Sequence, residues 1–170
     1  MTQLPMTQLP QGAPATLGAA FAHINAVTAP TLTDLKVMVL VEAAGLELYR
    51  KMAEGTGHAG VIDLLHHNGR EELAHAHRVS KAIKAMSGED FPPPAPQDNP
   101  YLQGGPLPSS PVSAAGLRKI AEGEFGGEKL YEGWAASIGH EEAARQFLLN
   151  GKEEADHGNR LLEAAALLEA

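Results

Sequence analysis

Apolar residues recur at alternating three- and four-residue steps in four stretches of the chain, the spacing of a helix with one buried face. These stretches predict helices over residues 31–54, from after Gly57 to about residue 86, over about 113–136 and over about 141–169. Thr31 and Asp34 have the spacing of a capping box, and Gly55 and Gly57 favour an end to the first helix. The inward stripes also carry polar residues, namely Glu42, Glu72, His75, Glu124, Glu154 and His157.

The two segments outside these helices have a different composition. Residues 1–30 are punctuated by proline, open with a doubled MTQLP and hold one modest apolar stretch, residues 15–27, which fits a short helix or an arm against a partner subunit. Residues 87–112 hold eight prolines and three glycines, so we expect neither helix nor central strand there. Extended at about 3 Å per residue, this segment can cross the full length of a bundle. The alternative is a disordered linker, but a lone two-helix hairpin buries too little surface to be stable.

The second half of the chain repeats the first at a distance of 82 residues without a gap. Glu42, Tyr49, Glu72 and His75 recur as Glu124, Tyr131, Glu154 and His157. Further pairs are Gly45/Gly127, Leu48/Leu130, Ala53/Ala135, Gly57/Gly139, His58/His140, Asn68/Asn150, Gly69/Gly151, Glu71/Glu153 and Arg78/Arg160. Such a repeat predicts two pseudo-symmetric helical hairpins, residues 31–86 and 113–170, which pack into one four-helix bundle.

The spacing within each hairpin predicts where the polar residues meet. In an antiparallel helix pair, residues equidistant from the turn lie opposite each other, and Gly57 is midway between Glu42 and Glu72, as Gly139 is between Glu124 and Glu154. A histidine three residues after a glutamate lies on the same helix face. Docking the hairpins about a two-fold axis therefore brings all six side chains to the bundle centre.

Composition limits the chemistry of such a centre. The chain has no cysteine, so a metal must be held by oxygen and nitrogen atoms. Four buried carboxylates are costly alone, whereas two divalent cations neutralise them. A single Glu-x-x-His is a weak signal, since about one is expected by chance in a chain rich in both residues. Two copies, each preceded by a glutamate 30 residues earlier, are strong. The alternative is that these residues lie on solvated faces and the repeat is a relic of duplication.

Charge and hydropathy bear on partners and location. A net charge of −8 without a Lys/Arg cluster argues against nucleic acid or an anionic membrane as a partner. No apolar run reaches the roughly 18 to 20 residues of a membrane span. The first basic residue is Lys36, so no charged segment opens a signal peptide, and we expect a cytoplasmic protein.

The order of Glu, Glu-x-x-His, Glu and Glu-x-x-His on four helices resembles the ferritin-like di-iron carboxylate superfamily. Residues 41–53, 70–78 (REELAHAHR) and 121–131 (AEGEFGGEKLY) are most similar to rubrerythrin, over roughly residues 31–86 and 113–170. The resemblance implies an all-α, ferritin-like bundle over residues 31–170, with an N-terminal arm (1–30) and a Pro-rich crossover (87–112). It further implies two iron ions, with manganese as the other candidate, bridged by Glu72 and Glu154, with Glu42 and Glu124 as terminal ligands and His75 and His157 capping one metal each.

Two departures from the rubrerythrin pattern change the expected function. Rubrerythrins carry a cysteine-ligated rubredoxin domain, which a chain without cysteine lacks, and a second glutamate where this chain has Gly127. We expect a di-iron peroxidase or oxidase that reacts with hydrogen peroxide or dioxygen and takes electrons from an external protein or small reductant, as a homodimer. The alternatives are a non-catalytic metal-binding or iron-handling protein, of ferroxidase or storage type, and a structural bundle without metal.

Other repeated residues have less specific roles. Tyr49 and Tyr131 lie two turns from Glu42 and Glu124, and the resemblance suggests that each phenol hydrogen-bonds a ligand carboxylate across the bundle; as plain core aromatics they would look the same. Gly69 and Gly151 either leave space for dioxygen or peroxide or are helix irregularities. We expect His58 and His140 to cap helices, His66, His67 and His77 to face solvent, and Gly126 and Gly127 to allow close helix packing.

Overall fold

A computed structural model describes residues 6–105 and 107–170. Helices are the only regular secondary structure among these residues. A short helix, α1 (Leu17–Ala26), precedes four long ones: α2 (Leu32–Glu54), α3 (Ala59–Ser87), α4 (Ala114–Ser137) and α5 (Glu141–Glu169). The four predicted helices are confirmed within one or two residues. The first copy of MTQLP lies outside the described residues.

Local signals in the sequence set the helix ends. The capping box of Thr31 and Asp34 is present at the start of α2, and Gly55 caps its end. His58 and His140 each accept a hydrogen bond from a backbone N–H of the first turn of α3 and α5, as expected. Gly88 ends α3 with a φ of +77°, a conformation that other residues adopt only at a cost.

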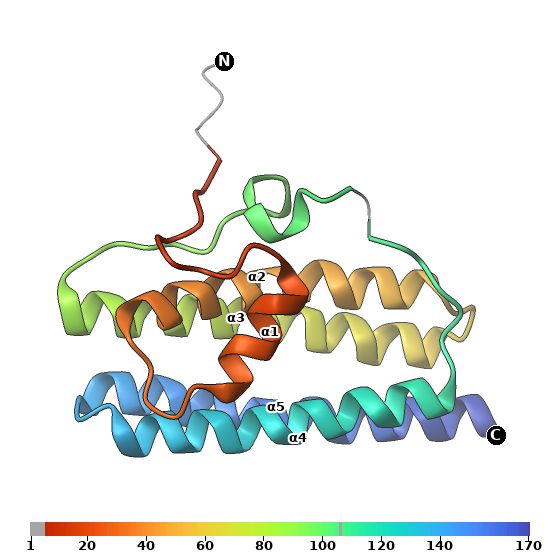
Figure 1. Ribbon diagram of the computed structural model, residues 1–170. Coiled ribbons are helices and arrows are strands. Elements are labelled where there is room, and N and C mark those ends of the chain that lie inside the picture. The colour runs from red at the N-terminus through yellow and green to blue at the C-terminus, as the bar shows by residue number, and fades with distance from the viewer. Residues whose placement is uncertain (1–5, 106) are drawn as a thin grey trace.

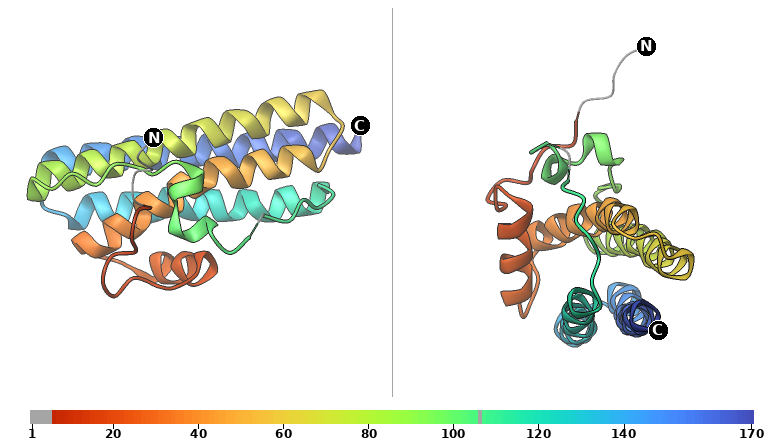
Figure 2. Two further views of the ribbon diagram at one scale, coloured as in Figure 1. Left: turned by 90° about the horizontal axis from the view of Figure 1, so that it is seen from above. Right: turned by 90° about the vertical axis from the view of Figure 1, so that its right-hand side faces the viewer.

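The four long helices lie along a common direction as two layers, α2 beside α3 and α4 beside α5 (Figures 1 and 2). Helix α3 also packs against α5. Within the described residues, α2 and α4 make no comparable contact, so the two layers are closed on the α3/α5 side and separated on the other. None of the helices described is both long and apolar enough to cross a bilayer.

Residues 7–30 pack on the bundle. Helix α1 lies against α2 and buries Ala20 and Ile24 (Figure 1). The ring of His23 is 2.7 Å from Asp34 of α2, and the indole of Trp134 donates to the carbonyl of Val27. Of the two interpretations of residues 15–27, the structure therefore contains the short helix, placed against its own chain.

The connection between α3 and α4, residues 88–113, runs along the outside of the helices (Figure 1). The expectation that it contains no helix was wrong in one respect, because Pro96–Asp98 and Pro100–Leu102 form short 3₁₀ turns. Proline is tolerated in the first position of such a turn, where its missing N–H would have no partner. The side chain of Asn99 is fully buried and donates to the carbonyl of Leu40, which ties the connection to α2.

Two apolar clusters form the core. One contains residues from the start of α2, the ends of α3 and α4 and the start of α5, including Leu40, Tyr131 and Phe147. The other, with Leu65 and Leu117, lies toward the opposite end of each helix. The predicted Glu and His residues fall between the two clusters on every helix, so the core has a polar layer at mid-length.

Candidate metal centre

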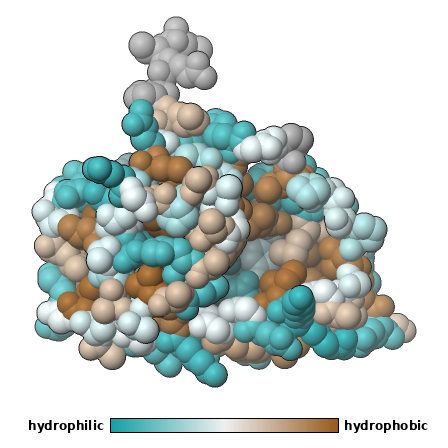
Figure 3. Space-filling model, viewed as in Figure 1, coloured by the Kyte–Doolittle hydropathy of each residue, from teal (hydrophilic) through white to brown (hydrophobic). Residues whose placement is uncertain are grey.

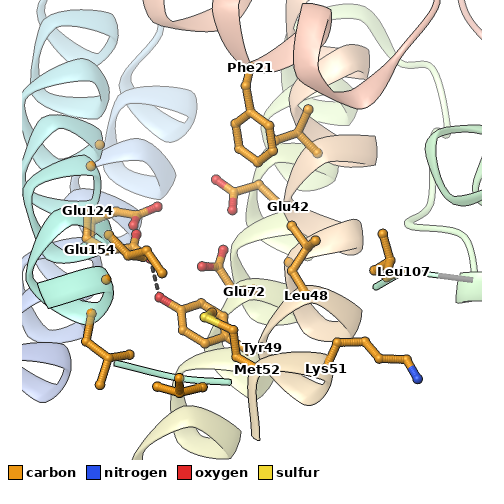
Figure 4. Close-up of a pocket in the computed structure, with 18 of the residues that line it drawn as sticks. Phe21, Glu42, Leu48, Tyr49, Lys51, Met52, Glu72, Leu107, Glu124 and Glu154 are labelled. Carbon is orange, nitrogen blue, oxygen red and sulfur yellow. Dashed lines mark hydrogen bonds between the residues drawn. The ribbon is translucent and has the colours of Figure 1, made fainter. Parts of the chain in front are cut away.

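Six polar side chains from four helices meet in this layer. Helix α2 contributes Glu42, α3 contributes Glu72 and His75, α4 contributes Glu124, and α5 contributes Glu154 and His157. Five of the six residues are buried, and the side chain of the sixth, Glu124, is only 14% exposed. Figure 4 shows Glu42 and Glu72 facing Glu124 and Glu154 across one shared space. The structure thus brings together every residue predicted as a metal ligand.

The six side chains form two overlapping groups of four, and a third group of three joins Glu72 to both histidines. Ligand atoms of Glu42, Glu72, His75 and Glu154 lie within 4.8 Å of one another, as do those of Glu72, Glu124, Glu154 and His157. Glu72 and Glu154 belong to both groups. This buried Glu/His cluster could hold a metal ion in each group, with two carboxylates in common.

The two histidines present an unsatisfied nitrogen to the carboxylates. The rings stack with centroids 5.0 Å apart. Nε2 of His75 lies 3.1 Å from Glu153, and Nε2 of His157 lies 3.1 Å from Glu71. A carboxylate only accepts, so each Nε2 carries a proton, and in the neutral ring Nδ1 carries the lone pair.

Both Nδ1 atoms are buried without a hydrogen-bond partner. Nδ1 of His75 is 3.3 Å from Glu154, and Nδ1 of His157 is 3.4 Å from Glu72. A lone pair aimed at carboxylate oxygens is unfavourable unless a proton or a metal ion lies between them. Burial alone would lower the pKa of His75, but the hydrogen bond to Glu153 and the nearby carboxylates of Glu154 and Glu42 raise it well above its ordinary value, so this ring favours a cation or a second proton at Nδ1. The arrangement therefore fits metal ions that take one imidazole each.

A layer of ion pairs behind the histidines fixes their orientation. Arg78 donates to both carboxylate oxygens of Glu153, at 2.6 and 2.8 Å, and to the amide oxygen of Asn150. Asn150 in turn donates to the carbonyl of His75. Burial alone would raise the pKa of Glu153, but hydrogen bonds from His75 and Arg78 lower it to about 2. Glu153 is thus a permanent anion that holds the Nε2 proton of His75.

The same network occurs a second time. Arg160 donates to both oxygens of Glu71 and to Asn68, and Asn68 donates to the carbonyl of His157. No role was predicted for these residues from the sequence. The signal that could have found them was present, because Asn68, Glu71 and Arg78 each recur 82 residues later.

The tyrosines contact the carboxylates of the opposite helix layer. The phenol of Tyr49 donates to Glu124, and that of Tyr131 donates to Glu42. The expected hydrogen bonds across the bundle are therefore present (Figure 4, dashed line from Tyr49). A catalytic role for the two tyrosines stays a prediction.

Glycines beside the cluster have two different packing roles. A Cβ on Gly45 would lie 2.9 Å from the side chain of Glu72, and one on Gly127 would lie 3.2 Å from that of Glu154, so these two glycines make room for carboxylates. Gly69 and Gly151 are buried against Tyr49 and Tyr131 and against the backbone of the neighbouring helix. The idea that they leave space for dioxygen or peroxide was wrong, since the adjacent helix occupies that space.

Without cations, the cluster cannot hold all its charges. Burial, followed by repulsion from the neighbouring carboxylates, raises the pKa of Glu72 well above its ordinary value. Burial and the proximity of Glu154 do the same for Glu124. A metal-free cluster therefore keeps some of its carboxyl groups protonated, whereas bound cations would ionise them.

Comparisons of the chain with protein-family models, with curated proteins and with solved structures found no match. The centre is therefore interpreted from its own residues.

Proposed function

We propose that this protein binds two iron ions in the Glu/His cluster and reacts with hydrogen peroxide or dioxygen, as a rubrerythrin-like peroxidase or oxidase supplied by an external electron donor. The observation that carries the proposal is the pair of buried, unpartnered Nδ1 atoms of His75 and His157, each among carboxylates. A structural bundle without metal would have no reason to bury these groups together.

The two overlapping groups support a division of roles among the ligands. Glu72 and Glu154 are common to both groups and would bridge the two ions. Glu42 and Glu124 would each complete one ion, with His75 and His157 as the nitrogen ligands. Two divalent ions balance four carboxylates, so the loaded centre carries no net charge from these groups.

The donor atoms limit which metal ions suit the cluster. Carboxylate oxygen and imidazole nitrogen suit iron, manganese and zinc, and the cluster offers no sulfur. Iron is proposed because its two oxidation states allow electron transfer to an oxidant, and because the ligand pattern resembles the ferritin-like di-iron proteins. Manganese remains the other candidate.

The chain's own groups would prepare the centre for that chemistry. Bound iron would supply the electrons that reduce the oxidant. Tyr49 and Tyr131 hold the terminal carboxylates in place, and each phenol keeps a proton beside Glu124 or Glu42. Glu71 and Glu153 fix the imidazoles through Nε2. The apolar clusters toward the two ends of the bundle limit the access of water to the layer along the helix axes.

The fold supports the same proposal. Helices α2 and α3 lie antiparallel, as do α4 and α5, and residues 88–113 pass from one end of the bundle to the other (Figure 1). We propose that this is the ferritin-like arrangement of two hairpins and a crossover. With no cysteine in the chain, electrons would come from a separate protein or a small reductant, and we expect a homodimer.

One observation favours a second function, iron handling of ferroxidase or storage type. Gly127 stands where the rubrerythrin pattern has a further glutamate, and a Cβ there would press on Glu154. The centre thus lacks the extra ligand that redox-linked exchange would use. A protein of this second kind would oxidise iron once per binding event and then stop.

Stopped-flow absorption of the protein loaded anaerobically with two Fe²⁺ per chain tests the proposal. We expect fast ferric absorption with hydrogen peroxide, slower oxidation with dioxygen, and repeated turnover only when a reductant is added. A Glu72→Gln/Glu154→Gln double variant is the control for iron bound elsewhere. If added reductant restores no turnover, the iron-handling function is the better explanation. If peroxide oxidises no iron while both ions stay bound, the peroxidase proposal fails.

A further inference from the structure

A cavity of about 620 Å³ lies between α2 and α4, which make far fewer contacts with each other than the paired helices of each layer do. Most of its wall is apolar. The α2 side includes Met38, Val41 and Leu48, and the α4 side includes Leu117, Ile120 and Leu130. Seen from outside, the hollow beside α1 has apolar residues along its edges (Figure 3). The volume lies within the range of about 300 to 1,000 Å³ typical of small-molecule sites.

The cavity is bounded along its length by two segments outside the four-helix core. Phe21 and Ile24 of α1 line one part, and Leu107, Pro111 and Val112 of the α3–α4 connection line another. Figure 4 shows Phe21 above Glu42, and Leu107 on the far side of α2 from the carboxylates. The cavity is therefore a bounded cleft rather than an open groove along the bundle.

The floor of the cleft is the polar layer. Glu42, Glu72, Glu124, Glu154 and Tyr49 all line it, whereas neither His75 nor His157 does. The cleft thus reaches the carboxylates from the side opposite the histidines. A molecule bound there would be in contact with the centre without displacing an imidazole.

At one position of the cleft wall, α4 lacks a side chain that α2 has. Val41 of α2 corresponds in the repeat to Gly123 of α4, and both line the cleft. A Cβ on Gly123 would have no atom within 4 Å. The space could thus be filled by a single larger residue, which would gain the dispersion contacts that an unfilled apolar wall lacks.

The dimensions favour a small molecule over another helix. A helix is about 10 Å across with its side chains, so about 620 Å³ would hold roughly 8 Å of it, or about five residues. α1 and the α3–α4 connection would also block a longer one. We propose that the cleft between α2 and α4 is the binding site of an apolar organic molecule, a medium-length aliphatic chain or an aromatic ring system, with its inner end against the carboxylates.

A fluorescence titration with N-phenyl-1-naphthylamine, a neutral apolar probe, tests the site. We expect one probe per chain, displaced by decan-1-ol, in both the metal-free and the zinc-loaded protein. Gly123→Phe should weaken probe binding at least tenfold, because the ring fills the cleft. The matched control is Gly133→Phe. Gly133 lies on the same helix and also has open space around it, but it is not part of the cleft wall, so this variant should bind the probe as the unmodified protein does.

Methyl NMR of the unmodified protein provides a second measurement that needs no variant. Decan-1-ol should shift the methyl signals of Met52 and Leu117, which line the cleft, and leave that of Leu162, exposed on α5, in place. Equal effects of the two phenylalanine variants, or shifts confined to Leu162, would overturn the proposal. A third result would also overturn it: the unmodified protein is a dimer that binds no probe, and Gly123→Phe dissociates this dimer. The cleft would then be the contact surface for a second copy of the chain.

These outcomes are separate from those for the proposed function. Probe binding by metal-free protein does not depend on iron. If the protein binds two iron ions and reacts with peroxide but takes up no probe, the proposed function stands and the cleft proposal fails. If it binds the probe but does not react with peroxide, the cleft proposal stands and the proposed function fails.

Discussion

At the scale of single residues, the direction of each imidazole depends on a carboxylate from the other helix layer. Glu153 and Glu71 accept from Nε2, and this turns each Nδ1, which has no hydrogen-bond partner, toward the centre of the layer. Two arginines hold these carboxylates in turn. Removing either partner would leave a buried group unpaired, which costs more than the hydrogen bond itself contributes.

The two shared carboxylates should be equivalent. Glu72→Gln and Glu154→Gln should each lower the metal content by at least one ion per chain, because each removes a charge that both groups use. Metal analysis after gel filtration measures this, with Glu132→Gln on the exposed face of α4 as the control. Full occupancy in one of the two variants would show that the shared, symmetric assignment is wrong.

The carboxylates behind the histidines should affect affinity rather than stoichiometry. Glu153→Gln and Glu71→Gln should weaken metal binding by about 10- to 100-fold, as is typical when a partner of a ligating histidine is lost. Competition with a chelator of known affinity measures the change. Glu163→Gln, exposed on α5, is the control and should have no effect. Unchanged metal affinity in both test variants would show that Glu153 and Glu71 do not position the histidines for metal binding.

At the scale of helices, the repeat places a glycine on α2 and on α4 directly beside a carboxylate of the paired helix. Gly45 faces Glu72 and Gly127 faces Glu154. Helices with these glycines lose some intrinsic stability, about 0.5 to 1 kcal/mol for each glycine relative to alanine. The close approach that they permit is what lets a glutamate side chain pass the neighbouring helix and reach the centre.

Two glycine substitutions of the same kind should therefore have opposite effects. Gly45→Ala would bring a Cβ within 2.9 Å of Glu72, so Glu72 must move, and we expect lower metal content and a lower melting temperature. Gly126→Ala meets nothing within 4 Å and should stabilise the protein by up to about 1 kcal/mol. Thermal unfolding and metal analysis of both variants check this. Equal stabilisation by both would mean that Gly45 is not needed for the site.

At the scale of the whole molecule, the polar layer divides the core into two apolar clusters and spans all four long helices. The stability of the bundle is therefore linked to the charge state of this layer. Ligands that bind only the folded state stabilise it by mass action, by about 4 kcal/mol at a thousandfold their dissociation constant.

Metal removal should lower the melting temperature by about 10 °C, since 1 kcal/mol corresponds to about 2 to 4 °C in a domain of this size. Glu72 and Glu124 have folded-state pKa values above the ordinary 4.5, so these two groups bind more protons in the folded metal-free protein than in the unfolded chain. Their contribution to stability is complete below pH 4.5 and is lost as the pH rises through the raised pKa values.

The metal-loaded form should respond to pH in the opposite sense. Its ligands must be deprotonated, so metal affinity rises with pH. We expect the difference in melting temperature between loaded and metal-free protein to widen from pH 5 to pH 8, as measured by calorimetry with verified metal content. A difference that stays constant, or melting that metal removal does not alter, would contradict the link between the carboxylates and stability.

The sequence by itself determined the four long helices and the depth of the six polar residues. Helix ends follow from local groups such as Thr31, Asp34 and His58, which satisfy backbone donors within a few residues. Glu42 and Glu72 share a level because they are equally distant from Gly57 in an antiparallel pair. Both kinds of inference need only distances along one chain segment.

The tertiary structure alone decided what lies between the two helix layers. The contacts of His75 with Glu153 and of Tyr49 with Glu124 depend on the rotation of one layer against the other, which no spacing along the chain fixes. The same holds for the cleft between α2 and α4 and for the seat of α1 on α2. Packing sets these arrangements, because many apolar contacts from distant segments must be satisfied at once.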